Sequence, residues 1–185
     1  MAVSGTESVN EGALGLDTLP VEEILRRLAD AQVQAAAAVR PAIASIARAA
    51  ELVADRLASS GRLVYAAAGS SALMAMADAL ELPGTFGIPR ERIAVLIAGG
   101  SQALYDLAGA PEDDGDAAVT ELRALQLNEG DCLIAISASG STPYAVAALD
   151  EARQRGAATI GIASNAGRPL VERADVGIVL ATPPE

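Results

Sequence analysis

The chain has 185 residues, of which 51% are hydrophobic, and its 24 acidic side chains outnumber 13 basic ones to give a formal net charge of −11. Because no segment concentrates the basic residues, nucleic acid and anionic membrane surfaces are not expected partners. The length and the apolar content are sufficient for one domain with a substantial core.

Two residue types are scarce, which limits the chemistry of the protein. The chain has no histidine, which excludes Ser–His and Cys–His nucleophile pairs and histidine-based metal sites, so acid–base chemistry must come mainly from carboxylates or tyrosines. Cys132 is the only cysteine, and its place in an apolar run indicates a buried small side chain. Neither a signal-peptide pattern nor an uncharged apolar run of about 20 residues is present, so we expect a soluble, cytoplasmic protein.

Residues 1–60 are predicted to form an N-terminal arm and a pair of helices. Residues 1–15 are polar and glycine-containing, which is typical of an arm with little structure of its own. An apolar stripe then begins after Pro20 and is predicted to break at Pro41, because the residue before a proline leaves the α region. A second amphipathic helix follows, up to Gly61. We expect the two helices to be antiparallel and to serve as a packing or dimerisation element.

Residues 61–185 alternate between short apolar runs and helical patterns. The runs predict strands at residues 63–68, 93–98, 133–136, 159–163 and 176–181. Helices are predicted at 72–82, where Pro83 should end the first one, at 117–127 with Asp116 as the cap, and at 143–155. This alternation predicts an α/β fold with a five-stranded parallel sheet flanked by helices. Ligands of such sheets bind beyond the carboxyl ends of the strands, near the switch in strand order.

A cluster of hydroxyl side chains follows the strand at 133–136. We call residues 137–142 the hydroxyl turn, and its members are Ser137, Ala138, Ser139, Gly140, Ser141 and Thr142. Pro143 then suits the first turn of a helix. Because hydroxyl groups and the free N–H groups of a helix start point to one place, the turn favours a small anion, above all phosphate. The simpler interpretation is that these side chains only cap the helix.

A second polar turn, formed by Gly69, Ser70 and Ser71, follows the strand at 63–68. It has neither the glycine spacing of a dinucleotide fingerprint nor the lysine of a P-loop. Taken alone it is equally well interpreted as a tight strand-to-helix turn that needs one glycine. Both turns are at carboxyl ends of strands, so they can face one ligand together.

Six motifs, in this order, resemble the SIS (sugar isomerase) domain, and more narrowly the N-acetylmuramic acid 6-phosphate etherases. They read LDTLPVEEIL, GRLVYAAAGSSA, DALELPGTFGIP, VLIAGG, SASGSTPYAV and GAATIGIASNAGRPL. The resemblance implies a three-layer sandwich at residues 61–185, a homodimer, no metal and no organic cofactor. It also implies a phosphorylated amino sugar held by both turns, with Ser70, Ser71, Ser139, Gly140 and Thr142 at the family's binding positions.

The resemblance also implies a reaction, in amino sugar metabolism and cell wall recycling. The family cleaves the lactyl ether of its sugar by elimination: a carboxylate takes the proton at C2, and an acid assists departure at C3. Water then adds to the unsaturated intermediate, which gives N-acetylglucosamine 6-phosphate and lactate.

This chain matches one of the two catalytic glutamates of the etherase family. Glu81 falls on one catalytic glutamate of the family, although without the family it would be interpreted as an ordinary solvated acid. The resemblance assigns the second catalytic glutamate to the start of a segment that normally reads E-G-A-E-D, where this chain has Gly109. Glu112 is the alternative second acid. Ser141 replaces an arginine of the family, and the family sequences continue beyond residue 185.

Two functions of different classes follow from these motifs. The first is a carbon–oxygen lyase of the etherase type. The second is a catalytically inactive sugar-phosphate sensor of the same fold, which Gly109 favours. Aldose–ketose isomerisation is less suited to this chain, because isomerases of this fold commonly open the sugar ring with a histidine.

Overall fold

The computed structural model describes residues 8–106 and 109–184, and at its centre is a five-stranded, fully parallel sheet. The strand order is β2-β1-β3-β4-β5. The strands are β1 (Leu63–Ala67), β2 (Ile93–Ile97), β3 (Cys132–Ile136), β4 (Ala158–Ala163) and β5 (Val176–Val179). Their apolar runs suit strands that are covered on both faces, and every residue of β1 is buried. The predicted α/β fold is confirmed.

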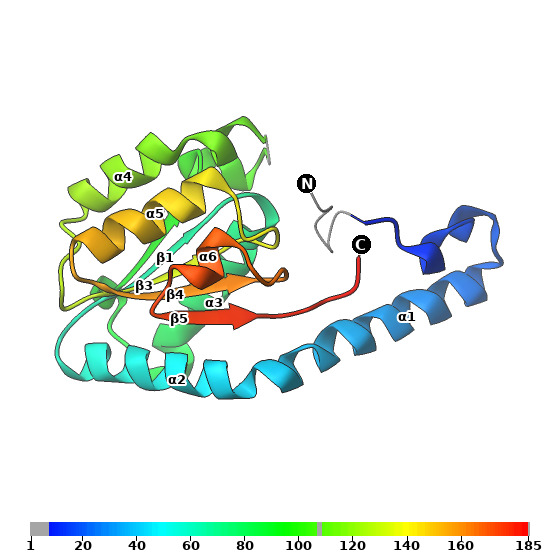
Figure 1. Cartoon of the computed structure of the whole chain (residues 1–185), viewed down its shortest axis with the longest axis horizontal. Coiled ribbons are helices and arrows are strands. Elements are labelled where there is room, and N and C mark those ends of the chain that lie inside the picture. The colour runs from blue at the N-terminus through cyan, green and yellow to red at the C-terminus, as the bar shows by residue number, and fades with distance from the viewer. Residues whose placement is uncertain (1–7, 107–108, 185) are drawn as a thin grey trace.

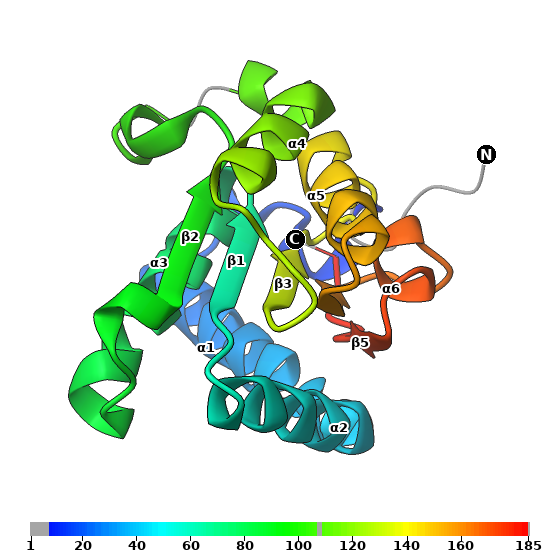
Figure 2. The same ribbon diagram turned by 90° about the vertical axis from the view of Figure 1, so that its left-hand side faces the viewer.

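Helices cover both faces of this sheet and give the molecule three layers (Figures 1 and 2). Helices α4 (Gly115–Ala124) and α5 (Pro143–Gln154) cover one face, with the short α6 (Pro169–Glu172) beside α5. Helices α2 (Val39–Ala58) and α3 (Gly69–Phe86) cover the opposite face. The two helices that follow β1 and β3, α3 and α5, therefore lie on opposite sides of the sheet.

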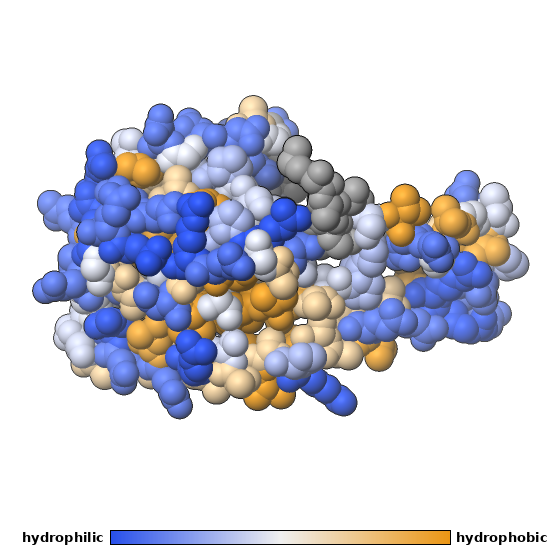
Figure 3. Space-filling model, viewed as in Figure 1, coloured by the Kyte–Doolittle hydropathy of each residue, from blue (hydrophilic) through white to orange (hydrophobic). Residues whose placement is uncertain are grey.

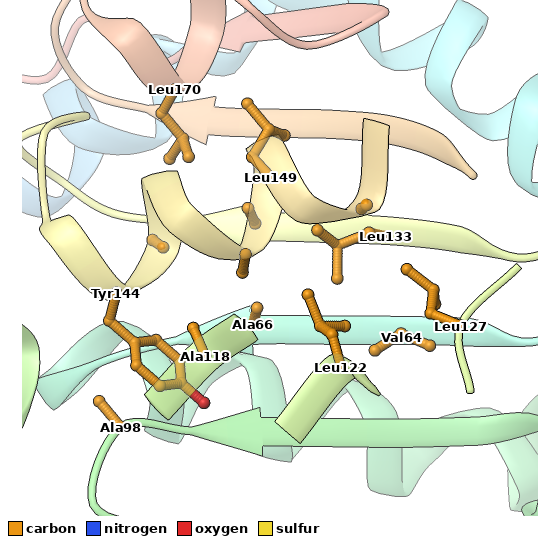
Figure 4. Packing of buried hydrophobic residues seen from close by; sticks show 14 of the residues in the cluster. Val64, Ala66, Ala98, Ala118, Leu122, Leu127, Leu133, Tyr144, Leu149 and Leu170 are labelled. Atoms are coloured by element: carbon orange, nitrogen blue, oxygen red, sulfur yellow. The ribbon is translucent and has the colours of Figure 1, made fainter. Parts of the chain in front are cut away.

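Each face of the sheet has its own hydrophobic core, because alternate side chains of a strand point to opposite faces. Val64 of β1 packs with Leu122 and Tyr144 towards α4 and α5 (Figure 4), whereas Leu63 belongs to the cluster on the α2 and α3 side. Tyr144 is fully buried, and its hydroxyl donates a hydrogen bond to the Glu121 carboxylate.

The N-terminal helices are not the antiparallel pair that we expected. Helix α1 (Val21–Ala37) and α2 are separated only by Ala38 and run on from one another, so that α1 extends away from the sheet (Figure 1). Pro41 lies in the first turn of α2, where its missing N–H is not needed, and one residue is too short a connection to reverse the chain. No residue of α1 is buried.

The boundaries of α3 and α4 also differ from the predictions. Helix α3 includes Pro83 in its last turn and continues to Phe86, and it ends before Gly87, whose φ is +67°. Helix α4 begins at Gly115, and its cap is Asp114 rather than Asp116: the Asp114 side chain accepts a hydrogen bond from the Ala117 N–H at 2.9 Å.

The described part of the N-terminal arm is more structured than we expected. It forms two 3₁₀ helices, Glu11–Ala13 and Leu16–Thr18, and the Asn10 amide donates to the Pro184 carbonyl at 3.0 Å. Residues 1–7 of the predicted arm lie outside the described residues. Among the helices of residues 8–106 and 109–184, none is long and apolar enough to cross a membrane.

Candidate functional site

The strand order places the two predicted turns next to each other. Strands β1 and β3 are neighbours, with Ala67 beside Ile136 at their carboxyl ends. The chain leaves β1 into α3 on one face and leaves β3 into α5 on the other, so the order of the strands reverses between them. Such a switch point is where parallel sheets of this kind bind ligands.

The side chains of the hydroxyl turn converge on Ser137, which is buried. Its Oγ lies 2.8 Å from the Thr142 Oγ1 and 3.1 Å from the Ser139 Oγ, and it accepts a hydrogen bond from the Gly140 N–H at 3.1 Å. The Ser139 Oγ accepts another from the Ser141 N–H at 3.2 Å. These bonds hold the Ser137, Ser139 and Thr142 hydroxyls together in one cluster.

Thr142 stands at the N-cap of α5, but its side chain makes no capping hydrogen bond to that helix. Instead it bonds to Ser137. The interpretation of the hydroxyl turn as a simple helix cap therefore does not describe Thr142. The free N–H groups at the start of α5 and the nearby hydroxyls together make a setting suited to a small anion.

The loop between β4 and α6, together with the start of α6, holds the hydroxyl turn in place through hydrogen bonds to its backbone. The Ala138 carbonyl accepts hydrogen bonds from the Ser164 N–H and the Asn165 amide, both at 3.0 Å, and the Gly140 carbonyl accepts one from the Leu170 N–H at 3.1 Å. A Cβ added to Gly140, whose φ is +73°, would lie 2.7 Å from the Arg168 Cβ. This position therefore requires glycine.

The other predicted turn is the first turn of α3 itself. Gly69 begins the helix, and Ala68 at the N-cap provides no side-chain hydrogen bond. The half-buried Glu112, from the 3₁₀ helix Ala110–Asp113, reaches this helix start: a Cβ added to Gly69 would lie 2.5 Å from the Glu112 Oε1. The structure thus brings the alternative second acid to the switch point.

Gly109, where the family's glutamate was expected, is exposed, and its carbonyl accepts a hydrogen bond from the Glu112 N–H at 3.0 Å. Glu81 is also exposed, and it accepts a hydrogen bond from the Thr85 hydroxyl at 2.7 Å. It is twelve residues further along α3 than Gly69, or about 18 Å at the rise of an α-helix. Within one chain, Glu81 is therefore not brought together with the start of α3.

An acidic cavity of about 530 Å³, which was not predicted from the sequence, lies beside the hydroxyl turn. Ser141 lines it together with four acidic residues, Asp113, Asp114, Asp116 and Asp150. The run of acids at 112–116 could have signalled it, but Asp150 comes from the middle of α5 and is brought near by the fold. Asp150 is paired with Arg173 at 2.6 Å.

The remaining reactive side chains belong to the core. Burial raises the pKa of the Cys132 thiol to about 12, so this cysteine stays protonated and is unsuited to act as a nucleophile. Burial, with the hydrogen bond that its hydroxyl donates to Asp78, likewise raises the pKa of Tyr65. Burial and the hydrogen bond to Glu121 raise the pKa of Tyr144. The carboxylates are left as the acid–base groups of the site.

The fold and the site define a doubly wound parallel α/β protein with a hydroxyl-rich turn at its switch point. A family model described as the SIS domain matches residues 28–164, and the chain belongs to this family.

Two sequence relatives show a closer similarity. The chain is 39% identical to the N-acetylmuramic acid 6-phosphate etherase of Deinococcus radiodurans over 180 residues, and 37% identical to that of Aeromonas hydrophila over the same length. Each alignment covers 97% of this chain, but 59% and 60% of the respective relative. The chain thus spans about three fifths of the length of these relatives.

Solved structures show the same fold at lower identity. The phosphoheptose isomerase of Neisseria gonorrhoeae superimposes with a TM-score of 0.65 at 23% identity, covering 86% of this chain and 83% of that chain. The phosphoheptose isomerase of Francisella tularensis has a TM-score of 0.61 at 23% identity, covering 90% and 84%.

Proposed function

We propose that this protein binds a phosphorylated amino sugar at the switch point, with the phosphate at the hydroxyl turn. The observation that carries this proposal is the convergence of the Ser137, Ser139 and Thr142 hydroxyls beside the start of α5. Hydroxyl donors and helix N–H groups satisfy phosphate oxygens without requiring a metal. The names of the etherase relatives support a sugar 6-phosphate as the ligand.

Within this function we propose the etherase type of lyase reaction. One carboxylate removes the proton at C2, the bond between C3 and the lactyl oxygen breaks as an acid protonates that oxygen, and water adds to the new double bond. The position of the Glu112 carboxylate at the start of α3 supports it as one of the two acid–base groups. Recycling of cell wall amino sugars in the cytoplasm would be the metabolic setting.

We further propose that the active form is a homodimer and that Glu81 acts in the site of the partner subunit. Glu81 is too far along α3 to reach the start of the same helix. The same helix exposes three large hydrophobic side chains, Met74, Leu80 and Phe86, each more than half exposed. Burial of this apolar surface by a second copy would carry Glu81 to another hydroxyl turn.

The sensor remains the second candidate function, and one observation favours it. The described part of a single chain brings one carboxylate, that of Glu112, to the start of α3, whereas the elimination needs a base and an acid. If Glu81 of a second copy is the other acid–base group, a protein that remained a monomer would bind the sugar phosphate without cleaving it.

The first experiment measures lactate release from N-acetylmuramic acid 6-phosphate, with calorimetric binding of N-acetylglucosamine 6-phosphate beside it. We expect Glu112→Gln to keep binding and to lose turnover by about 10²–10⁴-fold, which is typical for one member of an acid–base pair. Glu91→Gln, which changes an exposed acid ahead of β2, is the matched control and should change neither.

A double variant tests the location of the ligand. Ser139→Ala combined with Thr142→Ala should abolish binding, because it removes two of the converging hydroxyls. Unchanged affinity in this variant would show that the hydroxyl turn is not the site. Binding without lactate release by the unmodified protein would establish the sensor, and the absence of both signals would refute the proposed function.

A further inference from the structure

One cation stands next to the hydroxyl turn, and the sequence analysis did not single it out. Arg168 ends the loop between β4 and α6, and its Cβ and Cγ lie 2.7 and 3.2 Å from the position that a Cβ on Gly140 would occupy. The stem of this arginine therefore runs across the middle of the hydroxyl turn. The Ala163 Cβ, 3.0 Å from the same point, supports the turn beside it.

The position of Arg168 is unusual among the arginines of the chain. All 13 basic residues are arginines. In the described connections that follow the carboxyl ends of the five strands, Arg168 is the only arginine. Other arginines, such as Arg62 and Arg92, precede strands and lie at the opposite edge of the sheet. The hydroxyl turn itself has no basic residue.

The Arg168 guanidinium also has no partner among the described residues. Within residues 8–106 and 109–184, its side chain has no hydrogen bond and no ion pair, although Glu172 lies on the same short helix. The neighbouring Arg173, by contrast, is paired with Asp150 at 2.6 Å. An arginine kept free of partners next to a cluster of hydroxyls retains all five N–H donors for a ligand.

The acidic charges beside the hydroxyl turn oppose the binding of an anionic ligand, and a nearby cation would offset them. The cavity beside Ser141 is lined by Asp113, Asp114, Asp116 and Asp150, and the whole molecule carries a formal charge of −11. Because Asp150 is paired with Arg173, a dianionic phosphate brought to this edge is repelled mainly by Asp113, Asp114 and Asp116. Hydroxyl groups and one helix start supply partial charges only, whereas a guanidinium supplies a full one.

We propose that Arg168 is a binding residue that clamps the phosphate of the ligand against the hydroxyl turn from the side of the loop between β4 and α6. This proposal rests on the proposed function, since it takes a sugar phosphate as the ligand. The planar guanidinium can donate two parallel hydrogen bonds to phosphate oxygens, and it fixes the orientation of the phosphate as well as its charge.

The alternative is that Arg168 only packs its stem on Gly140, and the choice of variant separates the two roles. Arg168→Gln keeps the Cβ and Cγ that cover Gly140 and removes only the charge. Arg168→Lys keeps the charge but loses the planar fork. Arg153→Gln removes the same charge from an exposed position in the last turn of α5 and is the matched control.

The test is calorimetric binding of N-acetylglucosamine 6-phosphate, with N-acetylglucosamine as the phosphate-free probe, at low and high salt. We expect Arg168→Gln to weaken binding of the phosphorylated sugar about 10- to 100-fold, which is the range for hydrogen bonds to charged groups. The affinity of Arg168→Lys for the phosphorylated sugar should lie between those of Arg168→Gln and the unmodified protein. Arg153→Gln should bind it as tightly as the unmodified protein does. Binding of the phosphate-free sugar, which lacks the clamped group, should not change.

A rescue variant completes the test. Ser141→Arg in the Arg168→Gln background restores a cation to the exposed edge of the hydroxyl turn and should recover part of the lost affinity. An unchanged affinity in Arg168→Gln, or an equal loss for both sugars, overturns the proposal. If the unmodified protein binds neither sugar, the proposed function itself is wrong and the proposal is refuted with it.

Discussion

Gly140 shows how one residue sets the geometry of the site. Its positive φ lets the chain reverse within the hydroxyl turn, and its missing side chain lets the Arg168 stem and Ala163 approach the backbone. The Ser137 Oγ receives the Gly140 N–H, so the glycine also orients the central hydroxyl. The contacts that require a glycine at this position could not be predicted from the sequence.

We predict that Gly140→Ala destabilises the protein by roughly 1–3 kcal/mol, because the added Cβ meets the Arg168 Cβ and the backbone is held in a left-handed conformation. The matched control is Gly84→Ala, in α3, where an added Cβ meets nothing within 4 Å. That change should be neutral or stabilise by about 0.5–1 kcal/mol. Urea unfolding of both variants measures the difference, and equal stabilities would contradict the proposed role of Gly140.

At the scale of elements, the apolar runs were sufficient to predict the sheet. Continuous Ala, Val, Ile and Leu runs separated by helical patterns leave few alternatives to parallel strands. The placement of the hydroxyl turn and the first turn of α3 at one edge follows from the same rule, because carboxyl ends of neighbouring parallel strands share one edge. The helix ends were predicted less well, since Pro41 is accommodated in the first turn of α2, where its missing N–H is not needed, and Pro83 is accommodated in the last turn of α3.

The cap of α4 gives a direct test at this scale. We predict that Asp114→Ala lowers the free energy of unfolding by about 1 kcal/mol, because the carboxylate accepts the Ala117 N–H. Asp116→Ala removes the acid that the sequence favoured as the cap and should have less than about half that effect, since its side chain lies within the first turn. Thermal or urea unfolding distinguishes them, and a larger loss for Asp116→Ala would place the cap where the sequence suggested.

The contacts between distant segments could not be predicted from sequence patterns. Glu112 and Gly69 are 43 positions apart, and Arg168 and Gly140 are 28 apart. No periodicity links either pair. Each contact joins the connections after two neighbouring strands, β1 and β2 or β3 and β4, and it depends on the path that these irregular connections take. For the same reason Glu81 was expected at the site on its motif alone, and its distance along α3 became evident only in three dimensions.

At the scale of the whole molecule, helix α1 and the surface near it stand out. Helix α1 extends from the body with its apolar stripe exposed, including Val21, Leu25 and Val33. Figure 3 shows hydrophobic surface around β5 and the junction of α1 and α2. Exposed apolar surface of this kind suits association with another chain, and it adds a second candidate contact to the α3 side chains named for the proposed homodimer.

Mixing two inactive variants tests whether the site is shared between subunits. If the lyase activity is present, Glu81→Gln and Ser139→Ala should each be inactive alone. After unfolding and refolding together, random pairing would give one intact site in each mixed dimer and recover about a quarter of the full activity. Recovery requires that the two residues of one site come from different chains. No recovery, with mixed dimers demonstrated by mass, would place Glu81 and Ser139 in the same subunit's site.

The acid and the hydroxyls of this site are carried by different parts of the chain. The hydroxyl turn is braced by the loop after β4, whereas Glu112 is carried by a short 3₁₀ helix that begins at Ala110. If the proposed lyase activity is present, substitutions in that helix should therefore abolish it while ligand affinity persists. In evolution, a lyase on this scaffold could become a receptor for its former substrate by changes confined to one loop, and the reverse path would be equally short.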